Sequence, residues 1–198
     1  MKPYYIIVIV GFLACKNKEV KDADKTPEGD STEVKKYLPV GMFIQENLKR
    51  IETYSAAILM KTDSNQKKDS TYIKPEVLKD YAANFLVSEL DSTFFANNFK
   101  EESFADQNTE MVSFIYTAEK PEVKLKKVIV YVTSTANGDK VSKVYMENEK
   151  VSGDTLTRQK MTWRMDHYFI IAESREASKD FKQNIIRRVI WDPADFSE

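Results

Sequence analysis

The sequence predicts an α+β domain in which two N-terminal amphipathic helices pack on one face of a twisted antiparallel meander of about six strands. Two observations lead to this prediction. In residues 44–53 and 75–90 apolar side chains recur every three or four positions, the period of an amphipathic helix, whereas after residue 109 they mostly alternate with polar ones, the period of a strand. Helices first and strands afterwards favour a fold in which the helices gather on one side of the sheet.

The first helix is predicted from its apolar spacing. Ile44, Leu48 and Ile51 follow one another at steps of four and three, so they share one face of a helix that reaches about Thr53. Two alternatives remain open for residues 54–62. They either continue the helix or turn into a strand.

The second helix is predicted from Pro75 to about Leu90. Proline is best tolerated in the first turn of a helix, and Glu76 beside it favours the positive end of the helix dipole. Apolar residues follow at helical spacing, namely Val77, Leu78, Tyr81, Ala82, Phe85, Leu86 and Leu90.

Residues 91–108 form a polar connection that contains four phenylalanines, Phe94, Phe95, Phe99 and Phe104. A buried phenylalanine removes about 150–250 Å² of surface from water, so the first interpretation is that the four pin an irregular segment onto the core. The alternative is that they line the mouth of a pocket for an apolar ligand.

Strands are predicted in the last ninety residues, separated by turn signals. Asn137-Gly138 is typical of a two-residue hairpin turn with positive φ at both residues, and Gly153-Asp154 and Asp166-His167 mark further turns. The basic doublets Lys126-Lys127 and Arg187-Arg188 fall within strands, so the two members of each should face opposite sides, with edge positions blocking unwanted pairing. The strands are expected at about 109–116, 124–133, 140–148, 155–165, 168–173 and 182–191.

By its general shape such a domain resembles the small envelope domains of the cystatin-like, PepSY-like and NTF2-like types. This likeness concerns the fold alone and implies no activity.

The N-terminus has the layout of an exported protein. Lys2 precedes the apolar run Tyr4 to Ala14, which is shorter than the roughly 20 residues that a membrane-spanning helix needs. Phe12-Leu13-Ala14-Cys15 then resembles the lipobox of bacterial lipoproteins. The resemblance implies that residues 1–14 are removed as a signal peptide and that Cys15 is lipidated and becomes the membrane anchor. In that family the residues after the cysteine direct sorting, and Lys16 and Asn17 favour the outer membrane.

A tether follows the cysteine. Residues 16–36 hold six lysines, six acids and only three apolar residues, so they cannot bury enough surface to offset the entropy of ordering and are expected to be disordered. The predicted organisation is therefore a signal peptide at 1–14, the lipidated cysteine and tether at 15–37, and a single globular domain at 38–198.

Composition and motifs narrow the function. Removing Lys2 with the signal leaves 29 lysines and arginines against 31 acids, a net side-chain charge of −2 that does not suit a nucleic-acid partner. No cofactor and no metal are expected, because Cys15 is consumed by lipid and the chain has one histidine, His167. His167 is interpreted as a solvated turn residue.

The leading hypothesis is a lipid-anchored envelope protein with a non-enzymatic binding or structural role, whose partner is the membrane through its anchor and an envelope protein or extracellular target. The alternative is a carrier or sensor of a small apolar ligand held between the helices and the sheet. A third hypothesis, a hydrolase, needs an acid pair such as Asp63 with Asp69, or Glu101 with Glu102, to converge with His167.

Overall fold

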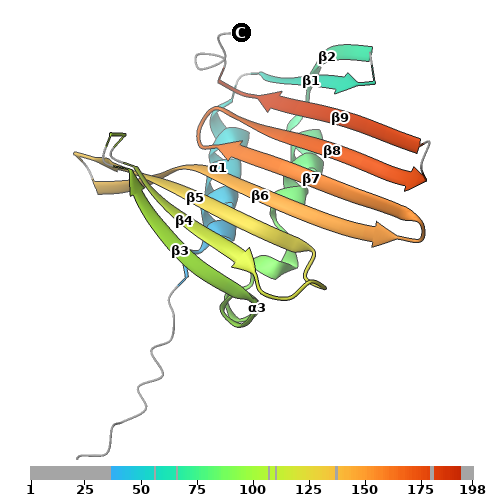
Figure 1. The fold of residues 1–198 in the computed structure, drawn as a ribbon. Helices are drawn as coiled ribbons and strands as arrows, with labels where there is room; N and C mark the ends of the chain where they lie inside the picture. The colour runs from blue at the N-terminus through green and yellow to red at the C-terminus, as the bar shows by residue number, and fades with distance from the viewer. Residues whose placement is uncertain are drawn as a thin grey trace, which may run out of the picture. The chain divides into compact units, whose positions relative to one another are not determined.

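A computed structural model describes residues 37–192 apart from 56, 66, 107, 110, 137, 179 and 180. The predicted signal peptide, Cys15 and the tether up to residue 36 lie outside the described residues. Within the described part the chain forms three α-helices, two 3₁₀ turns and nine strands (Figure 1). In chain order they are α1 (Val40–Tyr54), β1 (Ile58–Ser64), β2 (Lys67–Ile73), α2 (Pro75–Ala82), η1 (Ala83–Phe85), η2 (Ser88–Leu90), α3 (Ser92–Asn98), β3 (Phe99–Asp106), β4 (Met111–Ala118), β5 (Leu125–Thr135), β6 (Gly138–Ser152), β7 (Thr155–Arg164), β8 (Tyr168–Ser178) and β9 (Phe181–Ile190).

The described strands form one antiparallel sheet in the order β2-β1-β9-β8-β7-β6-β5-β4-β3. From β3 to β9 each strand pairs with the next one along the chain, which makes a meander. The β1–β2 hairpin, formed earlier in the chain, then adds to the free side of β9. The edges of the sheet are therefore β2 and β3.

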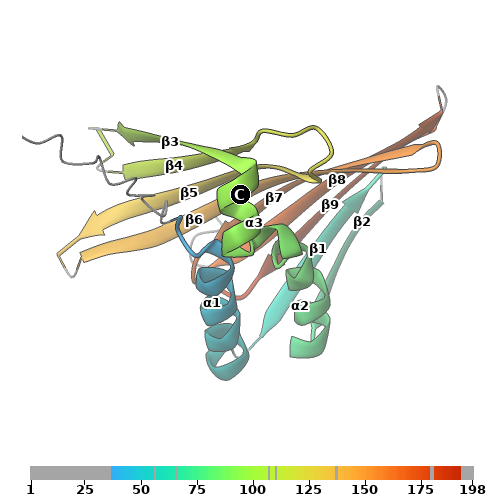
Figure 2. The ribbon, with the colours of Figure 1, turned by 90° about the horizontal axis from the view of Figure 1, so that it is seen from below.

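The sheet has a covered face and an open face. In Figure 2, α1, α2 and α3 lie on the same side of the strands, and Figure 1 looks onto the opposite side, with the strands in front of α1. Because side chains alternate along a strand, each strand contributes one set of residues to each face. We call the helix side the covered face and the other side the open face.

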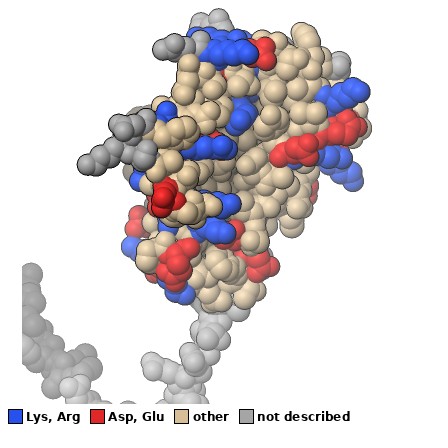
Figure 3. Space-filling view, turned by 90° about the vertical axis from the view of Figure 1, so that its right-hand side faces the viewer, with Lys and Arg blue, Asp and Glu red and all other residues tan. Residues whose placement is uncertain are grey.

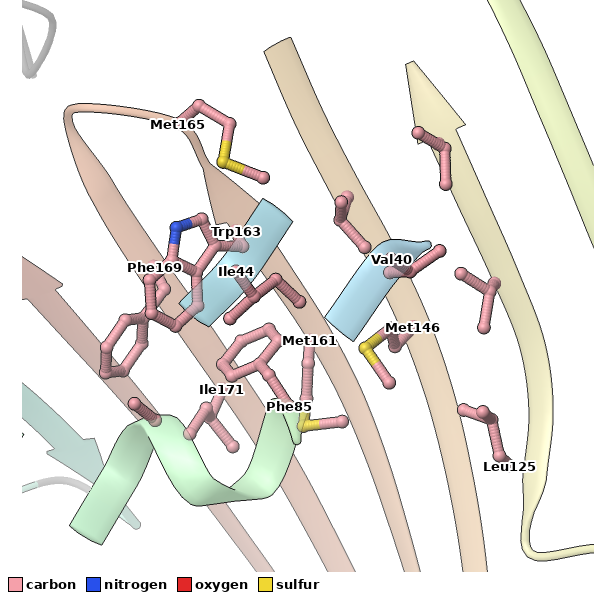
Figure 4. Packing of buried hydrophobic residues seen from close by; sticks show 14 of the residues in the cluster. Val40, Ile44, Phe85, Leu125, Met146, Met161, Trp163, Met165, Phe169 and Ile171 are labelled. Carbon is pink, nitrogen blue, oxygen red and sulfur yellow. The ribbon is translucent and has the colours of Figure 1, made fainter. Parts of the chain in front are cut away.

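The core fills the space between the helices and the covered face. Trp163 and Phe169 stack with ring centroids 5.0 Å apart, and Phe85 from η1 meets the Trp163 ring edge-on at 5.1 Å. Ile44 of α1 and Leu78 of α2 are fully buried in the same cluster. Figure 4 shows Ile44 of α1, Phe85 of η1, and Trp163 and Phe169 of the neighbouring strands converging, so the interior is packed with side chains.

A polar contact fixes α1 to the sheet. The side-chain oxygen of buried Asn47 accepts a hydrogen bond from Trp163 Nε1 at 2.8 Å, and Asn47 Nδ2 donates to Asp166 Oδ1 at 2.8 Å. Arg50 and Lys140 also contact the Asp166 carboxylate, at 2.7 and 3.0 Å. Asp166 has a φ of 68° in the β7–β8 turn, a conformation that costs energy for a residue with a side chain and is held here by these contacts.

Burial raises the pKa of Asp166, but hydrogen bonds and charges from Lys140, Arg50 and Asn47 outweigh this effect. The pKa of Asp166 therefore lies below its usual value, and the carboxylate is ionised at neutral pH.

The predicted fold class, two N-terminal helices on a meander of about six strands, is wrong. The described part of the chain holds nine strands and three short helices, and a hairpin separates α1 from α2. All six predicted strands exist, but β1, β2 and β3 were not among them. Residues 54–62, for which two alternatives were open, contain the start of β1. β2 and β3 are exposed edge strands that bury few side chains, so they carry little of the apolar alternation that marks a strand.

The second predicted helix is shorter than expected. α2 ends at Ala82, and the side chain of Asn84 donates to the carbonyl of Tyr81 at 2.8 Å. That carbonyl would accept the backbone N–H of Phe85 in a continued helix, so Asn84 competes with the helical hydrogen bond. The chain continues instead as the 3₁₀ turns η1 and η2, which bring Phe85 into the core.

Two predicted connections also differ. The β5–β6 hairpin forms and Gly138 has a φ of 105°, but Thr135 pairs with Gly138, so residues 136–137 separate the strands and Gly138 begins β6. Asn137 lies outside the described residues. The charged segment after residue 174, expected as a loop, continues β8 to Ser178. No helix among the described residues is long and apolar enough to cross a membrane.

Candidate binding face

The four phenylalanines of the predicted pocket mouth divide between core and surface. Phe95 of α3 and Phe99 of β3 are buried and stack with ring centroids 4.3 Å apart. Phe94 is 37% exposed, and Phe104 is 63% exposed on β3. Phe95 also borders an open groove of about 340 Å³ between α1 and η2. The four side chains therefore do not gather around one cavity.

The residues considered for chemistry are likewise distributed over the domain. Asp69 of β2 pairs with the residue before Asp63 of β1, so these two carboxylates face opposite sides of the sheet. Glu101 and Glu102 are consecutive residues of β3, so they also face opposite sides. The side chain of His167 is only 26% exposed and its Nδ1 lies 3.3 Å from Asp192 Oδ2. The interpretation of His167 as a solvated turn residue is therefore wrong, although it does lie in the β7–β8 turn.

A wide pocket of about 570 Å³ lies beside α1 and the β5–β6 hairpin. Lys49, Arg50 and Lys140 line it together with Glu46 and Asp139. Charges of both signs are mixed in this lining, so the pocket does not favour one charge of ligand.

The open face has a more ordered pattern. The register pairs Tyr131 of β5 with Lys143 of β6, Lys143 with Arg164 of β7, and Arg164 with Tyr168 of β8. Their chain neighbours Val130, Val144, Trp163 and Phe169 are buried on the covered face, so these four side chains point to the open face. We call Tyr131, Lys143, Arg164 and Tyr168 the cation–tyrosine row.

Lys143 is held within this row by its neighbours. Its Nζ lies 3.9 Å from the centre of the Tyr131 ring, a cation–π contact. Burial lowers the pKa of Lys143, and the positive charge of Arg164 lowers it further. The four side chains of the row are half-buried, so they lie along the sheet rather than project from it.

A second pair of cations stands in register on the same face. Arg188 of β9 pairs with Lys61 of β1 on one side and with Ile170 of β8 on the other. Like charges directly opposite one another in a sheet destabilise it, typically by about 0.2–1 kcal/mol relative to neutral pairs. The open face contains this arrangement twice, at Lys143/Arg164 and at Lys61/Arg188.

The rows on the side of the β6–β7 turn have the opposite pattern. Glu147 stands in register between Lys127 and Lys160, and Glu149 is opposite Arg158. Arg158 Nε lies 3.1 Å from the Glu149 carboxylate. Opposite charges therefore neutralise one another here, and we call these residues the neutralised rows.

Tyr145 lies between the two regions. Its hydroxyl donates a hydrogen bond of 2.7 Å to Glu147. Burial and the Glu147 carboxylate raise the pKa of Tyr145 above its usual value, so the hydroxyl stays protonated.

Aromatic side chains extend the cation–tyrosine row toward both edges of the sheet. On one side of the row, Tyr131 pairs with Ser113 of β4, and Ser113 pairs with Phe104 of β3. On the other side, Tyr168 is followed in register by one residue of β9, one residue of β1 and then Tyr72 of β2. Phe104 and Tyr72 are 63% and 74% exposed. The extended row crosses nine strands, roughly 38 Å at the usual spacing between strands, and its member on β9, Ile190, is only 4% exposed. Figure 3 views the domain from the side rather than onto the open face, and there lysine, arginine and acidic side chains are mixed over the surface.

The sequence contains a faint signal for this face. Ile129 and Tyr131, and Lys143 and Tyr145, occupy alternate positions of the strands, where large rings and cations stand in place of small polar residues. Of the doublet Arg187-Arg188, Arg187 lies 5.7 Å from the ring centre of Tyr81 on the covered face, and Arg188 faces the open side, as alternation predicted. β9 lies inside the sheet, so the edge-blocking interpretation is wrong for this doublet.

Comparison with known proteins gives no relative, since no family model, no curated protein sequence and no solved structure matches the chain. The geometry of this domain and the N-terminal sequence are therefore the observations that bear on function.

Proposed function

We propose that the chain is a lipid-anchored protein of the cell envelope with a non-enzymatic binding role, and that it holds an anionic envelope component against the open face of its sheet. The observation that carries this proposal is the pairing in register of Lys143 with Arg164 and of Lys61 with Arg188. Each pair places two positive charges next to one another, and an anion lying over them would be attracted by both members of the pair.

The anchor in this proposal is supported by the sequence. The run Phe12-Leu13-Ala14-Cys15 resembles a lipobox, and the highly charged residues 16–36 suit a flexible connection between a lipid and a domain. We place the protein at the outer membrane, where an open sheet face on a tether would reach other components of the envelope.

The binding role is tested with the full-length protein in detergent and envelope material stripped of its own proteins. Lys143→Glu with Arg164→Glu reverses two charges in the cation–tyrosine row and should weaken binding by about tenfold or more, which corresponds to about 1.4 kcal/mol. Lys127→Glu with Lys160→Glu makes the same charge change in the neutralised rows and should weaken binding by less than about threefold. Equal losses in the two variants would contradict the proposed site.

The anchor is tested by mass spectrometry of the N-terminal peptide. The proposal expects the mature protein to begin at Cys15 and to carry acyl chains, and expects Cys15→Ser to accumulate as the uncleaved precursor. An unmodified peptide beginning at Cys15, or one that retains Met1, would show that the lipid anchor is wrong.

A further inference from the structure

The sheet ends at β3, the strand at its border in Figure 1, and no described strand pairs with the outer side of β3. We infer that this edge is a self-association site. A second copy of the chain adds its own β3 there in antiparallel orientation, with Ser103 of one copy opposite Ser103 of the other. The inference concerns the edge of the sheet and does not rest on the ligand proposed for the open face.

Every second residue of β3 directs its main-chain groups away from the sheet. Asn98 stands opposite Glu119 in the register of β3 with β4, and its carbonyl accepts the backbone N–H of Glu119 at 2.9 Å. In an antiparallel pair such bonded residues alternate with residues whose N–H and C=O point the other way. The outward-facing residues of β3 are therefore Phe99, Glu101, Ser103 and Ala105. The Phe99 carbonyl agrees with this assignment, since it accepts a hydrogen bond from the Tyr37 hydroxyl at 3.3 Å.

The outer side of β3 is open from Glu101 to Ala105. Residues 100–105 are all exposed, and β3 pairs with β4 over eight residues in unbroken register. Proline and β-bulges, two common protections of an edge strand, are both absent from β3. An exposed row of outward N–H and C=O groups of this kind is a template for another strand.

The charges of β3 select one register for two copies of the strand. Main-chain bonds form when outward-facing residues of the two copies stand opposite one another, which requires the pairing to centre on a residue. Centring on Glu102 sets this acid opposite its own copy, and centring on Phe104 sets Glu102 opposite Asp106. Centring on Ser103 instead sets Lys100 opposite Asp106 at both ends, and no like charges stand directly opposite one another. Opposite charges in such positions stabilise a sheet.

Lys100 and Asp106 have contacts within one copy, and both keep capacity for a further one. Lys100 Nζ lies 2.9 Å from the Glu102 carboxylate, but the two side chains are 66% and 63% exposed, so this surface pair contributes little. An ammonium group has three donors. The two oxygens of Asp106 each accept one hydrogen bond, from the Asn108 backbone and the Thr109 hydroxyl, and each carboxylate oxygen can accept two.

The same register also brings the exposed rings of Phe104 together. Phe104 of each copy stands opposite Glu102 of the other, so the two rings are diagonal neighbours, a distance that aromatic side chains can reach. Phe104 is 63% exposed in one copy, and this contact would cover part of it. The pairing ends at the Phe99 carbonyl, which Tyr37 already occupies.

The other edge of the sheet, β2, lacks this self-complementarity. Pairing two β2 strands about Ser70 sets Lys68 opposite Tyr72 and Lys67 opposite Ile73, so neither lysine meets an acid. Lysines on an edge strand commonly prevent pairing. A second copy therefore fits β3 and not β2.

The pairing would join two sheets into one. Side chains keep their face when antiparallel strands pair, so the open faces of the two copies would lie on the same side of the joined sheet. Self-association at β3 would therefore present two copies of the proposed binding face side by side.

The test traps the pair with a disulfide in full-length protein in detergent. Ser103→Cys places two thiols opposite one another, where directly paired residues have Cα atoms about 5.5 Å apart, a spacing that suits a disulfide. Ser70→Cys is the matched control, an exposed serine in the middle of the other edge strand. The wild type, whose only cysteine is Cys15, measures any bridging through that residue. After mild oxidation at equal concentration, we expect Ser103→Cys to give at least about fivefold more covalent dimer than Ser70→Cys. Equal yields, after the wild-type background is subtracted, would overturn the inference.

Two further changes in the Ser103→Cys protein test the main-chain pairing and the register. Ala105→Pro removes an N–H that faces away from β4, so the domain should stay folded while the yield of dimer falls by about fivefold or more. Lys100→Glu sets an acid opposite Asp106 and should lower the yield by about threefold or more. Lys68→Glu makes the same charge change on β2 and should leave the yield unchanged. Melting curves check the fold of each variant, and an undiminished yield in folded Lys100→Glu protein would contradict the proposed register.

Self-association and anion binding can fail separately. Adding Lys143→Glu with Arg164→Glu to the Ser103→Cys protein should leave the yield of dimer unchanged, because neither residue lies on β3. A dimer that forms without binding of envelope material would overturn the proposed function alone. Binding of envelope material by a protein that gives no dimer would overturn the self-association alone.

Discussion

The two faces of the sheet are built from the same strands, but packing determines the side chains of one face and the arrangement of charge distinguishes those of the other. Trp163 and Arg164 are neighbours on β7, yet Trp163 is fully buried under Phe85 while Arg164 stands beside Lys143 on the open side. On the covered face the side chains can be explained by packing. On the open face the neutralised rows place opposite charges next to one another, whereas the Lys143/Arg164 and Lys61/Arg188 pairs place like charges next to one another. The difference teaches that packing selects the residues of the covered face, while the arrangement of charge changes from one region of the open face to another.

The largest effect is expected at the centre of the covered face. Trp163→Ala removes a fully buried ring from between Phe85 and Phe169, and truncation of a buried tryptophan costs about 3–5 kcal/mol. Arg164→Ala, one residue along the chain, should change the free energy of unfolding by less than about 1 kcal/mol. Chemical denaturation measures the free energy of unfolding of both variants. Similar decreases in the two variants would contradict the contrast between the two faces.

The polar contact below α1 should have the next largest effect. Asn47→Ala leaves Trp163 Nε1 buried without its acceptor, which should destabilise the domain by about 1–3 kcal/mol. Arg50→Gln removes a partly exposed partner of Asp166 and should cost less than about 1 kcal/mol. If Arg50→Gln proved the more damaging of the two in urea denaturation, the contact would depend on the surface ion pair rather than on the buried amide.

The same contact predicts a pH dependence that the open face does not share. The pKa of Asp166 is lower in the folded than in the unfolded protein, so its contribution to stability is complete above the unfolded value of about 3.9. This contribution is lost as the pH falls below 4 and through the folded pKa. Asp166→Asn should therefore flatten part of the acid limb of a melting-temperature profile between pH 5 and pH 2, and an unchanged limb would argue against the assignment.

The smallest effect distinguishes the two regions of the open face. Arg188→Gln removes one member of a like-charge pair and should raise the free energy of unfolding by about 0.2–1 kcal/mol. Lys160→Gln makes the same change beside Glu147 and should lower it by a similar amount. Urea denaturation of the two variants gives the sign of each change. Changes of the same sign would remove the contrast between the cation pairs and the neutralised rows.

Parts of this fold could be predicted from the sequence because burial leaves a periodic pattern. The apolar steps from Ile44 to Ile51 correctly predict α1, and the alternation after residue 109 predicts β4 to β9. β2 and β3 bury little as sheet edges, so no such pattern marks them. The end of α2 depends on one local hydrogen bond, from Asn84 to Tyr81, which competes with apolar spacing that continues to Leu90.

The candidate face was harder to predict because it depends on register. A shift of one residue between paired strands moves every side chain to the other face. The pairing of β5 with β6 shifts between Tyr131 and Val132, at the edge of the cation–tyrosine row. Which residues stand opposite Lys143 therefore follows from an irregularity that the spacing of apolar residues does not reveal. Cys15 and the tether stay predictions of the sequence, since they lie outside the described residues.

The most direct test of the central claim, that the open face is a binding face, is the affinity for envelope material of one variant. Lys61→Gln, Lys143→Gln, Arg164→Gln and Arg188→Gln together remove the positive charges of both like-charge pairs. Full-length protein with these four changes should remain folded, which a melting curve checks, and should bind envelope material about a hundredfold more weakly, or about 2.8 kcal/mol. A folded variant that binds as tightly as the wild type would contradict the claim.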